Sequence, residues 1–182
     1  MVEPSEEHSV LCHLKFMAHR VKNNEVITNS RLDNIQGNCK NAMNRVERKL
    51  NRCRKPKQME AKGQWINGLC RASENQIGQN FGKWKNADKS LYSANFSTEK
   101  RRGCMKDTAD SYRKDFMEIF KYANELKAYW QTEKENGNSD AAAELDIVQG
   151  IFDDNDVQDG WKHCVNELDN IVDLLTPQLR VD

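Results

Sequence analysis

The amino-acid sequence predicts an all-α fold, a disulfide-stapled helical bundle of about six helices, two of which are long. Three observations carry this prediction. Proline and glycine are few, three and nine among 182 residues, and Lys, Glu, Asn and Ala dominate, which favours helices. Apolar residues recur at steps of three and four, the spacing of one helical face. Six cysteines lie far apart along the chain and can supply the staples.

The two long helices follow from the two clearest apolar stripes. A first, shorter helix is expected over about residues 4–21, with Pro4 in its first turn. The long helices are expected over about residues 26–54, stopped by Pro56, and about residues 98–134. The first long stripe consists of Leu32, Ile35, Cys39, Ala42, Met43, Val46, Leu50 and Cys53. The second consists of Met105, Ala109, Tyr112, Phe116, Ile119, Phe120, Ala123, Leu126 and Trp130.

Three further segments complete the predicted bundle. Residues 58–84 carry a weaker apolar pattern, and their four glycines predict an interruption near residues 74–78. Residues 140–152 are expected to form a short helix with Ser139 as its N-cap. Residues 154–175 are expected to form the last helix. We expect the whole chain to be a single helical domain, and a subdivision near 85–97 stays open.

The cysteines predict an extracellular protein. They are Cys12, Cys39, Cys53, Cys70, Cys104 and Cys164. An even number without a C-x-x-C pair favours three disulfides over a zinc site, and six buried free thiols in a cytosolic protein are the alternative. Predicted chain reversals on either side of the first long helix bring Cys12 and Cys70 level with Cys39. Cys12 is the favoured partner, and the connectivity as a whole stays open.

Other features of the sequence agree with secretion. Met1 is followed at once by Val2, Glu3, Pro4 and a run of polar residues, which we interpret as a mature secreted chain given an initiator methionine. The sequon that begins at Asn95 makes this residue a candidate glycosylation site. No apolar run approaches the roughly 18 residues of a membrane span.

The sequence predicts a protein that is not an enzyme, with no catalytic or metal-binding residues and no cofactor. Motifs such as G-x-S-x-G, the Walker A loop and H-E-x-x-H do not occur. Four histidines are present: His8, His13, His19 and His163. We interpret them as surface or half-buried side chains. The acidic run of residues 153–160 departs from a calcium loop at Val157 and Gln158. We interpret it as the charged start of a helix, with a weak cation site as the alternative.

Charge is distributed unevenly, although 28 basic and 28 acidic residues cancel. Residues 40–62 are mostly basic and residues 140–173 mostly acidic. We predict that the basic residues form a binding surface for an anionic partner such as an acidic protein or an anionic glycan. The alternative is that the two segments lie together and neutralise each other. The predicted surface, here named the basic stretch, consists of Lys40, Arg45, Arg48, Lys49, Arg52, Arg54, Lys55 and Lys57. Nucleic acid is not expected, because aromatic residues are not interleaved with these charges.

The chain resembles the salivary helical proteins of blood-feeding insects in its size, its helicity and its scattered cysteines. The cysteine steps are 27, 14, 17, 34 and 60 residues, so the step from Cys39 to Cys53 departs from the odorant-binding pattern. The resemblance is closest to a mosquito group that includes collagen-binding antiplatelet proteins and a neutrophil-stimulating factor. The long acidic arm of the collagen-binding proteins is missing, which argues against that activity.

This resemblance implies action on a host protein or a cell-surface receptor. We therefore predict a secreted, non-enzymatic interaction protein, a salivary effector that modulates host immune cells or haemostasis. The alternative is an extracellular carrier that holds a small hydrophobic ligand between helices. The tryptophans could line such a pocket, but we interpret them as core residues. They are Trp65, Trp84, Trp130 and Trp161.

Overall fold

The computed structural model describes residues 27–85 and 98–176, and within them the fold is all-α without strands. The elements in chain order are α2 (Asn29–Arg52), the 3-10 turn η1 (Lys57–Met59), α3 (Glu60–Lys85), α4 (Thr98–Glu135), α5 (Ala141–Phe152) and α6 (Asn155–Leu175). The all-α prediction is confirmed. The described residues contain five α-helices that make four rods, not six helices. The first predicted helix, residues 4–21, lies outside the described part.

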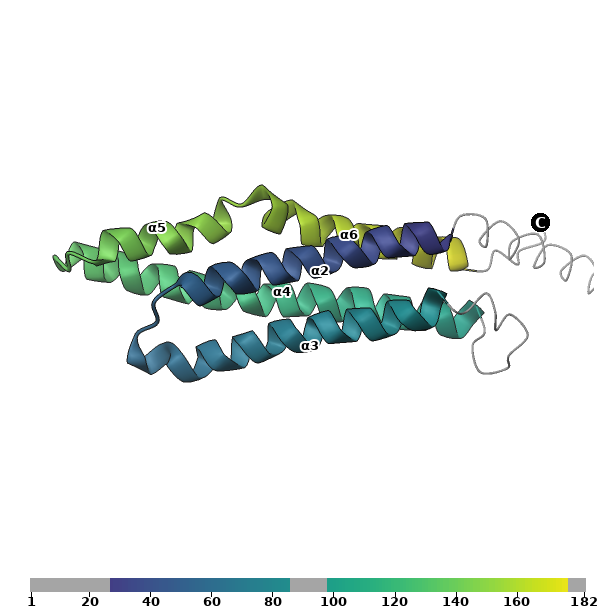
Figure 1. The fold of residues 1–182 in the computed structure, drawn as a ribbon, viewed down its shortest axis with the longest axis horizontal. Helices are drawn as coiled ribbons and strands as arrows, with labels where there is room; N and C mark the ends of the chain where they lie inside the picture. Colours follow the sequence, from purple (N-terminus) through teal and green to yellow (C-terminus); the bar gives the residue numbers. More distant parts are fainter. Residues whose placement is uncertain (1–26, 86–97, 177–182) are drawn as a thin grey trace, which may run out of the picture.

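The four rods form an elongated up-and-down bundle (Figure 1). α5 and α6 follow one another along α4, so that together they act as the fourth rod. α2 packs against α3 on one side and against α5 and α6 on the other, and α4 does the same. Each rod is therefore antiparallel to its neighbours, which is the arrangement that short connections favour. α3 lies diagonally opposite the α5–α6 rod. Its outer face, turned away from α2 and α4, is not covered by another described rod.

Both long stripes predicted from the sequence lie in the core. Every residue of the first stripe is buried, and every residue of the second is buried except Phe120, which is partly covered. The prediction that the tryptophans are core residues holds for Trp84 and Trp130, and Trp161 packs on the core while half-buried. It is wrong for Trp65, whose side chain on α3 is 55% exposed.

Three aromatic side chains of α4 tie the α2–α3 hairpin to the rest of the bundle. The Tyr112 hydroxyl donates a hydrogen bond to the backbone carbonyl of Cys39 in α2. The Trp130 indole donates at 3.1 Å to the carbonyl of Arg54, just after α2, and the Tyr122 hydroxyl donates at 3.1 Å to η1. Each ring thus buries its apolar body in the core while its polar tip satisfies a backbone carbonyl.

Two local predictions are wrong. α3 continues without a break through residues 74–78, because a glycine costs a helix only about 1 kcal/mol and packing against two neighbouring helices offsets that cost. Ser139 is not the N-cap of α5. The helix begins one residue later, after Asp140, whose side chain makes no capping hydrogen bond. The backbone N–H of Asp140 instead donates to the side chain of Asn138.

Gly63 and Gly68 provide a matched pair for testing the packing of α3. A Cβ on the buried Gly63 would lie 2.7 Å from the Tyr122 hydroxyl oxygen, whereas a Cβ on the exposed Gly68 would meet nothing within 4 Å. We expect Gly68→Ala to raise the free energy of unfolding by about 0.5–1 kcal/mol. Gly63→Ala should lower it by about 1 kcal/mol or more, because the new methyl displaces the Tyr122 hydroxyl from its carbonyl. Urea unfolding followed by circular dichroism measures both, and equal gains would contradict this packing.

Candidate functional site

The break between α5 and α6 is organised around one buried carboxylate, Asp154. Its side chain is 4% exposed and receives Arg45 Nε at 2.5 Å and Lys49 Nζ at 3.2 Å, both from α2. The same carboxylate is the N-cap of α6 and accepts the backbone N–H groups of Asp156 and Val157. Burial by itself would raise the pKa of Asp154, but the hydrogen bonds from Arg45 and Lys49 outweigh it and hold the pKa below its ordinary value. The interpretation of the acidic run as a helix start is confirmed.

Other members of the basic stretch also meet partners within the chain. Arg54 lies 4.0 Å from Asp140, and its backbone N–H donates to Glu144. The Lys55 ammonium donates to the backbone carbonyls of Leu50 and Cys53 at the end of α2. For part of the basic stretch, the alternative from the sequence is therefore correct: its charges are neutralised by acidic residues of the other segment. The side chains that stay exposed are those of Arg45, Arg48, Arg52, Arg54 and Lys57, and their use as a binding surface stays a prediction.

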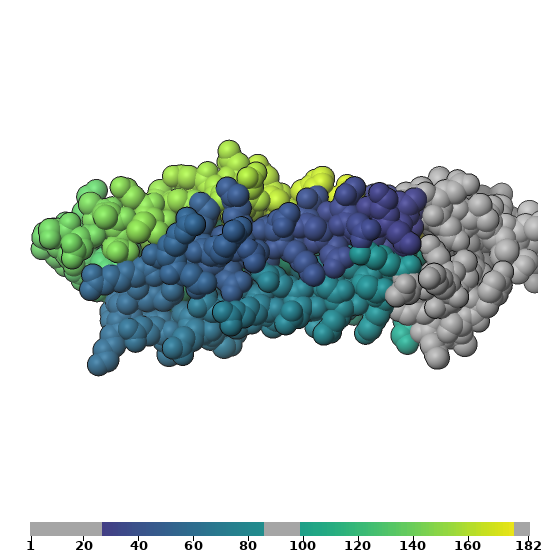
Figure 2. All heavy atoms as spheres, viewed as in Figure 1, coloured from purple at the N-terminus to yellow at the C-terminus, as the bar shows by residue number. Residues whose placement is uncertain are grey.

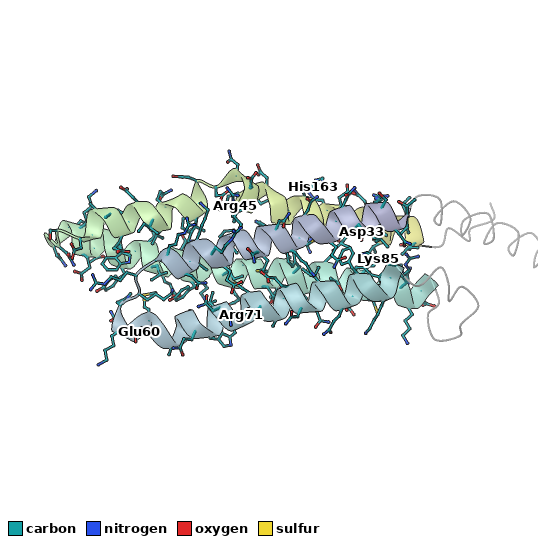
Figure 3. The ribbon with its side chains drawn as sticks, viewed as in Figure 1. Asp33, Arg45, Glu60, Arg71, Lys85 and His163 are labelled. Carbon is teal, nitrogen blue, oxygen red and sulfur yellow. The ribbon has the colours of Figure 1, made fainter. Side chains whose placement is uncertain are left out.

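A groove of about 630 Å³ lies between α2 and α6 beside this ionic cluster. Arg48 lines it from α2, and Asp159 and His163 line it from α6. The helices come close at its floor, where a Cβ on Gly160 would lie 3.4 Å from the Cβ of Ala42. Figure 3 shows Arg45 and His163 along this side of the molecule. His163 is exposed, as its interpretation as a surface residue requires.

The opposite side of the bundle carries a second groove, of about 580 Å³, between α3 and α4. Its lining combines apolar side chains such as Leu69 with hydroxyl, amide and carboxylate groups. Asn80 donates to the Thr108 hydroxyl at 2.8 Å across it. Burial raises the pKa of Asp115 in this groove, and a hydrogen bond with Ser73 partly offsets the effect. The groove therefore presents both apolar surface and hydrogen-bonding groups.

Next to this groove, the outward face of α3 carries no charged residue over five turns. The face, here named the α3 strip, consists of Ala61, Trp65, Gly68, Ala72, Asn75, Gln76 and Gln79, all exposed. These positions recur at steps of three and four and so share one side of the helix. Lys62 and Arg71 border the strip, and each is paired with a carboxylate of a neighbouring helix, Glu125 and Glu47. Figure 2 shows α3 along one edge of the molecule. In a chain with 31% charged residues, such a strip is unusual.

Between α2 and α3, two carboxyl groups lie close together. Glu47 is buried and accepts a hydrogen bond from Arg71 at 3.3 Å. Burial, and next the charge of Glu47, raise the pKa of Glu74, while Lys40 and Asn44 act in the opposite direction. Among the described residues, the buried Oε1 of Glu74 finds no hydrogen-bond partner. Ionisation of Glu74 is therefore less favourable in the folded chain than in the unfolded chain.

The oxidation state of the cysteines differs from the three disulfides expected from the sequence. The described ones are all free thiols: Cys39, Cys53, Cys70, Cys104 and Cys164. The predicted disulfide staples are therefore not present among the described residues, and Cys12 lies outside them, as do Asn95 and the three N-terminal histidines. Burial raises the pKa of Cys53 to about 11 and that of Cys70 to about 12, which makes both thiols unreactive at neutral pH.

The expected alignment of Cys70 with Cys39 is wrong because of the register between α2 and α3. Ion pairs join Asp33 to Lys85 and Glu47 to Arg71, and Figure 3 shows where Asp33, Lys85 and Arg71 lie along the two helices. Residues whose numbers sum to 118 therefore lie opposite one another, which places Cys70 more than two turns from the level of Cys39. The extended residues before η1 lengthen the reversal and produce this offset, which the position of Pro56 alone did not reveal.

Comparison with protein-family models, curated proteins and solved structures found no match to this chain. Among the described helices, none combines the length and apolarity needed to cross a bilayer. Within the same residues, no group of three or more His, Cys, Asp or Glu side chains is arranged to hold a metal ion.

The lowered pKa of Asp154 predicts that the free energy of unfolding falls in acid. Because its pKa is lower in the folded chain than the unfolded value of about 3.9, the ionised carboxylate stabilises the fold at neutral pH. That contribution is lost as the pH falls through the folded value. We expect Asp154→Asn, which keeps a capping side chain, to lower the free energy of unfolding by about 1.5–3 kcal/mol at pH 7 and by much less near pH 2. Asp153→Asn, an exposed neighbour, is the control, and an equal loss for both would contradict the role of Asp154.

For Glu74 we expect the opposite pH dependence of stability. Because its pKa is raised in the folded chain, the cost of ionising it is present above the folded pKa. That cost disappears as the pH falls below the unfolded value of about 4.3. Glu74→Gln should therefore raise the urea midpoint at pH 7 and leave it unchanged below pH 4. The exposed Glu135→Gln serves as the control. A lower midpoint for Glu74→Gln at pH 7 would show that the ionised carboxylate supports the fold.

Proposed function

We propose that the chain is a secreted, non-enzymatic interaction protein that contacts its partner through the α3 strip and the adjoining α3–α4 groove. The observation that carries this proposal is the exposure of Trp65 on a helical face without charged residues. Protein interfaces are depleted of charge at their centres and enriched in tryptophan. Tryptophan is also among the residues that most often dominate binding energy.

The surroundings of Trp65 support its role as an anchor. Among the described rods, α3 makes extensive contact with α2 and α4, and no other described rod covers its outer face, which is where a partner would bind. Ala72 and Gln76 belong to both the strip and the groove. A partner could thus cover Trp65 with apolar surface and place hydrogen-bond donors against the carboxylates of Asp107 and Asp115, which line the groove.

The cellular setting of the proposal comes from the sequence. Six scattered cysteines and the resemblance to mosquito salivary proteins favour an extracellular effector with disulfide bonds that acts on host immune cells or on haemostasis. The first partners to test are therefore blood leukocytes, platelets and plasma proteins. The basic stretch supplies a second surface for the same partner, because Arg48 and Arg52 keep exposed side chains on α2.

The test compares two exposed apolar residues on neighbouring helices. Trp65 and Met117 are 55% and 63% exposed, but the helical neighbours of Met117 on α4 include the charged Asp110, Lys114 and Lys121. Fluorescently labelled chain is titrated onto washed leukocytes and platelets and measured by flow cytometry. We expect Trp65→Ala to weaken saturable binding at least tenfold and Met117→Ala to change it less than twofold.

Two outcomes would overturn this assignment. Equal effects of Trp65→Ala and Met117→Ala would remove the α3 strip from consideration. Loss of binding in the double variant Arg48→Glu and Arg52→Glu, with normal binding by Trp65→Ala, would transfer the site to the basic stretch. Circular dichroism of each variant confirms that the helices are intact.

A further inference from the structure

Two buried cysteines face each other across the interface between α2 and α6. Cys39 and Cys164 have no exposed surface, and the Cys164 side chain is close enough to Cys39 to raise the pKa of its thiol. The Sγ of Cys164 also lies 3.9 Å from the backbone carbonyl oxygen of Ile35, one helical turn before Cys39. The two sulfurs therefore occupy the same level of one helix pair.

The helix backbones are close enough at this level for a covalent bridge. One turn away on each helix, a Cβ on Gly160 would lie 3.4 Å from the Cβ of Ala42. A disulfide requires Cβ atoms about 3.5–4.5 Å apart. The small residues at 42 and 160 thus bring α2 and α6 together where the two cysteines meet.

Ion pairs on both sides hold the register that aligns the two sulfurs. Arg31 of α2 pairs with Glu167 of α6 at 3.1 Å. Beyond the other side of the cysteines, Arg45 of α2 pairs with Asp154 at the start of α6. A slip of one helix along the other would break both pairs, so these pairs keep Cys164 at the level of Cys39 across this interface.

We propose that Cys39 and Cys164 form a disulfide bond that staples α2 to α6 in the secreted protein. The pairing rests on the extracellular location in the proposed function, because a reducing compartment would keep both thiols free. The reaction is thiol–disulfide exchange with oxidised glutathione or an equivalent protein disulfide. One thiolate attacks the disulfide and releases one glutathione thiol. The second thiolate then displaces the other, so that two thiols become one disulfide and two glutathione thiols form.

The bond forms before the core closes. The neighbouring Cys164 side chain, together with burial, raises the pKa of Cys39 well above its ordinary value, which suppresses the thiolate in the folded chain. Exchange is therefore slow once the bundle is packed, and the finished bond is protected from reductants. This assignment replaces the favoured pairing of Cys39 with Cys12 and leaves Cys12, Cys53, Cys70 and Cys104 for any further bridge.

Peptide mapping tests the pairing directly. The full chain is refolded in a glutathione redox buffer, alkylated in denaturant and digested with trypsin without reduction. Cleavage yields residues 32–40 and 163–180, which contain Cys39 and Cys164 as their single cysteines. We expect these peptides to be joined, with a mass two hydrogens below their sum. Recovery of both in alkylated form, or joined to other cysteines, would overturn the proposal.

Thermal unfolding provides an independent measurement. Reduction should lower the melting temperature of the oxidised chain by roughly 5–15 °C. The double variant Cys39→Ala and Cys164→Ala should lose the part of that sensitivity that this bridge supplies, whereas Cys70→Ala, also buried, leaves this bridge intact and should keep that part. Equal sensitivity of the double variant would contradict a stabilising bridge at this site.

The disulfides of the protein isolated from its natural source distinguish a failure of this proposal from a failure of the proposed function. If the refolded chain joins the two peptides but the protein isolated from its source has free thiols, the extracellular location fails and the pairing stands. If the source protein has disulfides that avoid Cys39 and Cys164, the pairing fails and the extracellular location stands.

Discussion

The carboxylate of Asp154 organises the described bundle. A charge that is buried in a helix break is stable only if it is paired and hydrogen-bonded on several sides, and two α2 cations together with two α6 backbone N–H groups meet that demand. This single group caps the start of α6, the second half of the fourth rod, and its ion pairs with Arg45 and Lys49 fix the position of α2 along α6. The alignment of Cys39 with Cys164 and the neutralisation of Arg45 and Lys49 both follow from it.

The two sides of the bundle are stabilised in different ways. The α2–α6 side combines close backbone approach with ion pairs, and α4 packs on α6 through stacked aromatics, such as Phe116 on Trp161 with ring centroids 5.4 Å apart. The α3 side contains four glycines, the unfavourable Glu74 and an open groove toward α4. α3 makes extensive contact with α2 and α4 among the described helices. A surface that is uncharged and only moderately stabilising within its own chain is well suited to gain stability from a partner.

Sequence patterns predicted the buried faces better than the details at helix ends and interfaces. The stripes over 26–54 and 98–134 were right because a 3.6-residue period marks a buried face whatever covers it. The break expected near residues 74–78 was wrong because a local propensity of about 1 kcal/mol per glycine yields to tertiary packing. Trp65 was expected in the core because periodicity on a weakly apolar helix did not show which side would be covered. The uncharged residues spaced three and four positions apart on both sides of Trp65 were the signal that could have revealed the α3 strip.

The sequence by itself determined the helical class, the extent of the long helices, the break after residue 152 and the absence of known catalytic motifs, because these depend on residue type and spacing along one segment. Only the tertiary structure decided which charges meet, which cysteines face each other and which face of α3 stays open. Those outcomes depend on register and on the choice of neighbouring rods. Both are set by contacts between residues far apart in the sequence, from Glu47 with Arg71 to Arg31 with Glu167, which no local pattern encodes.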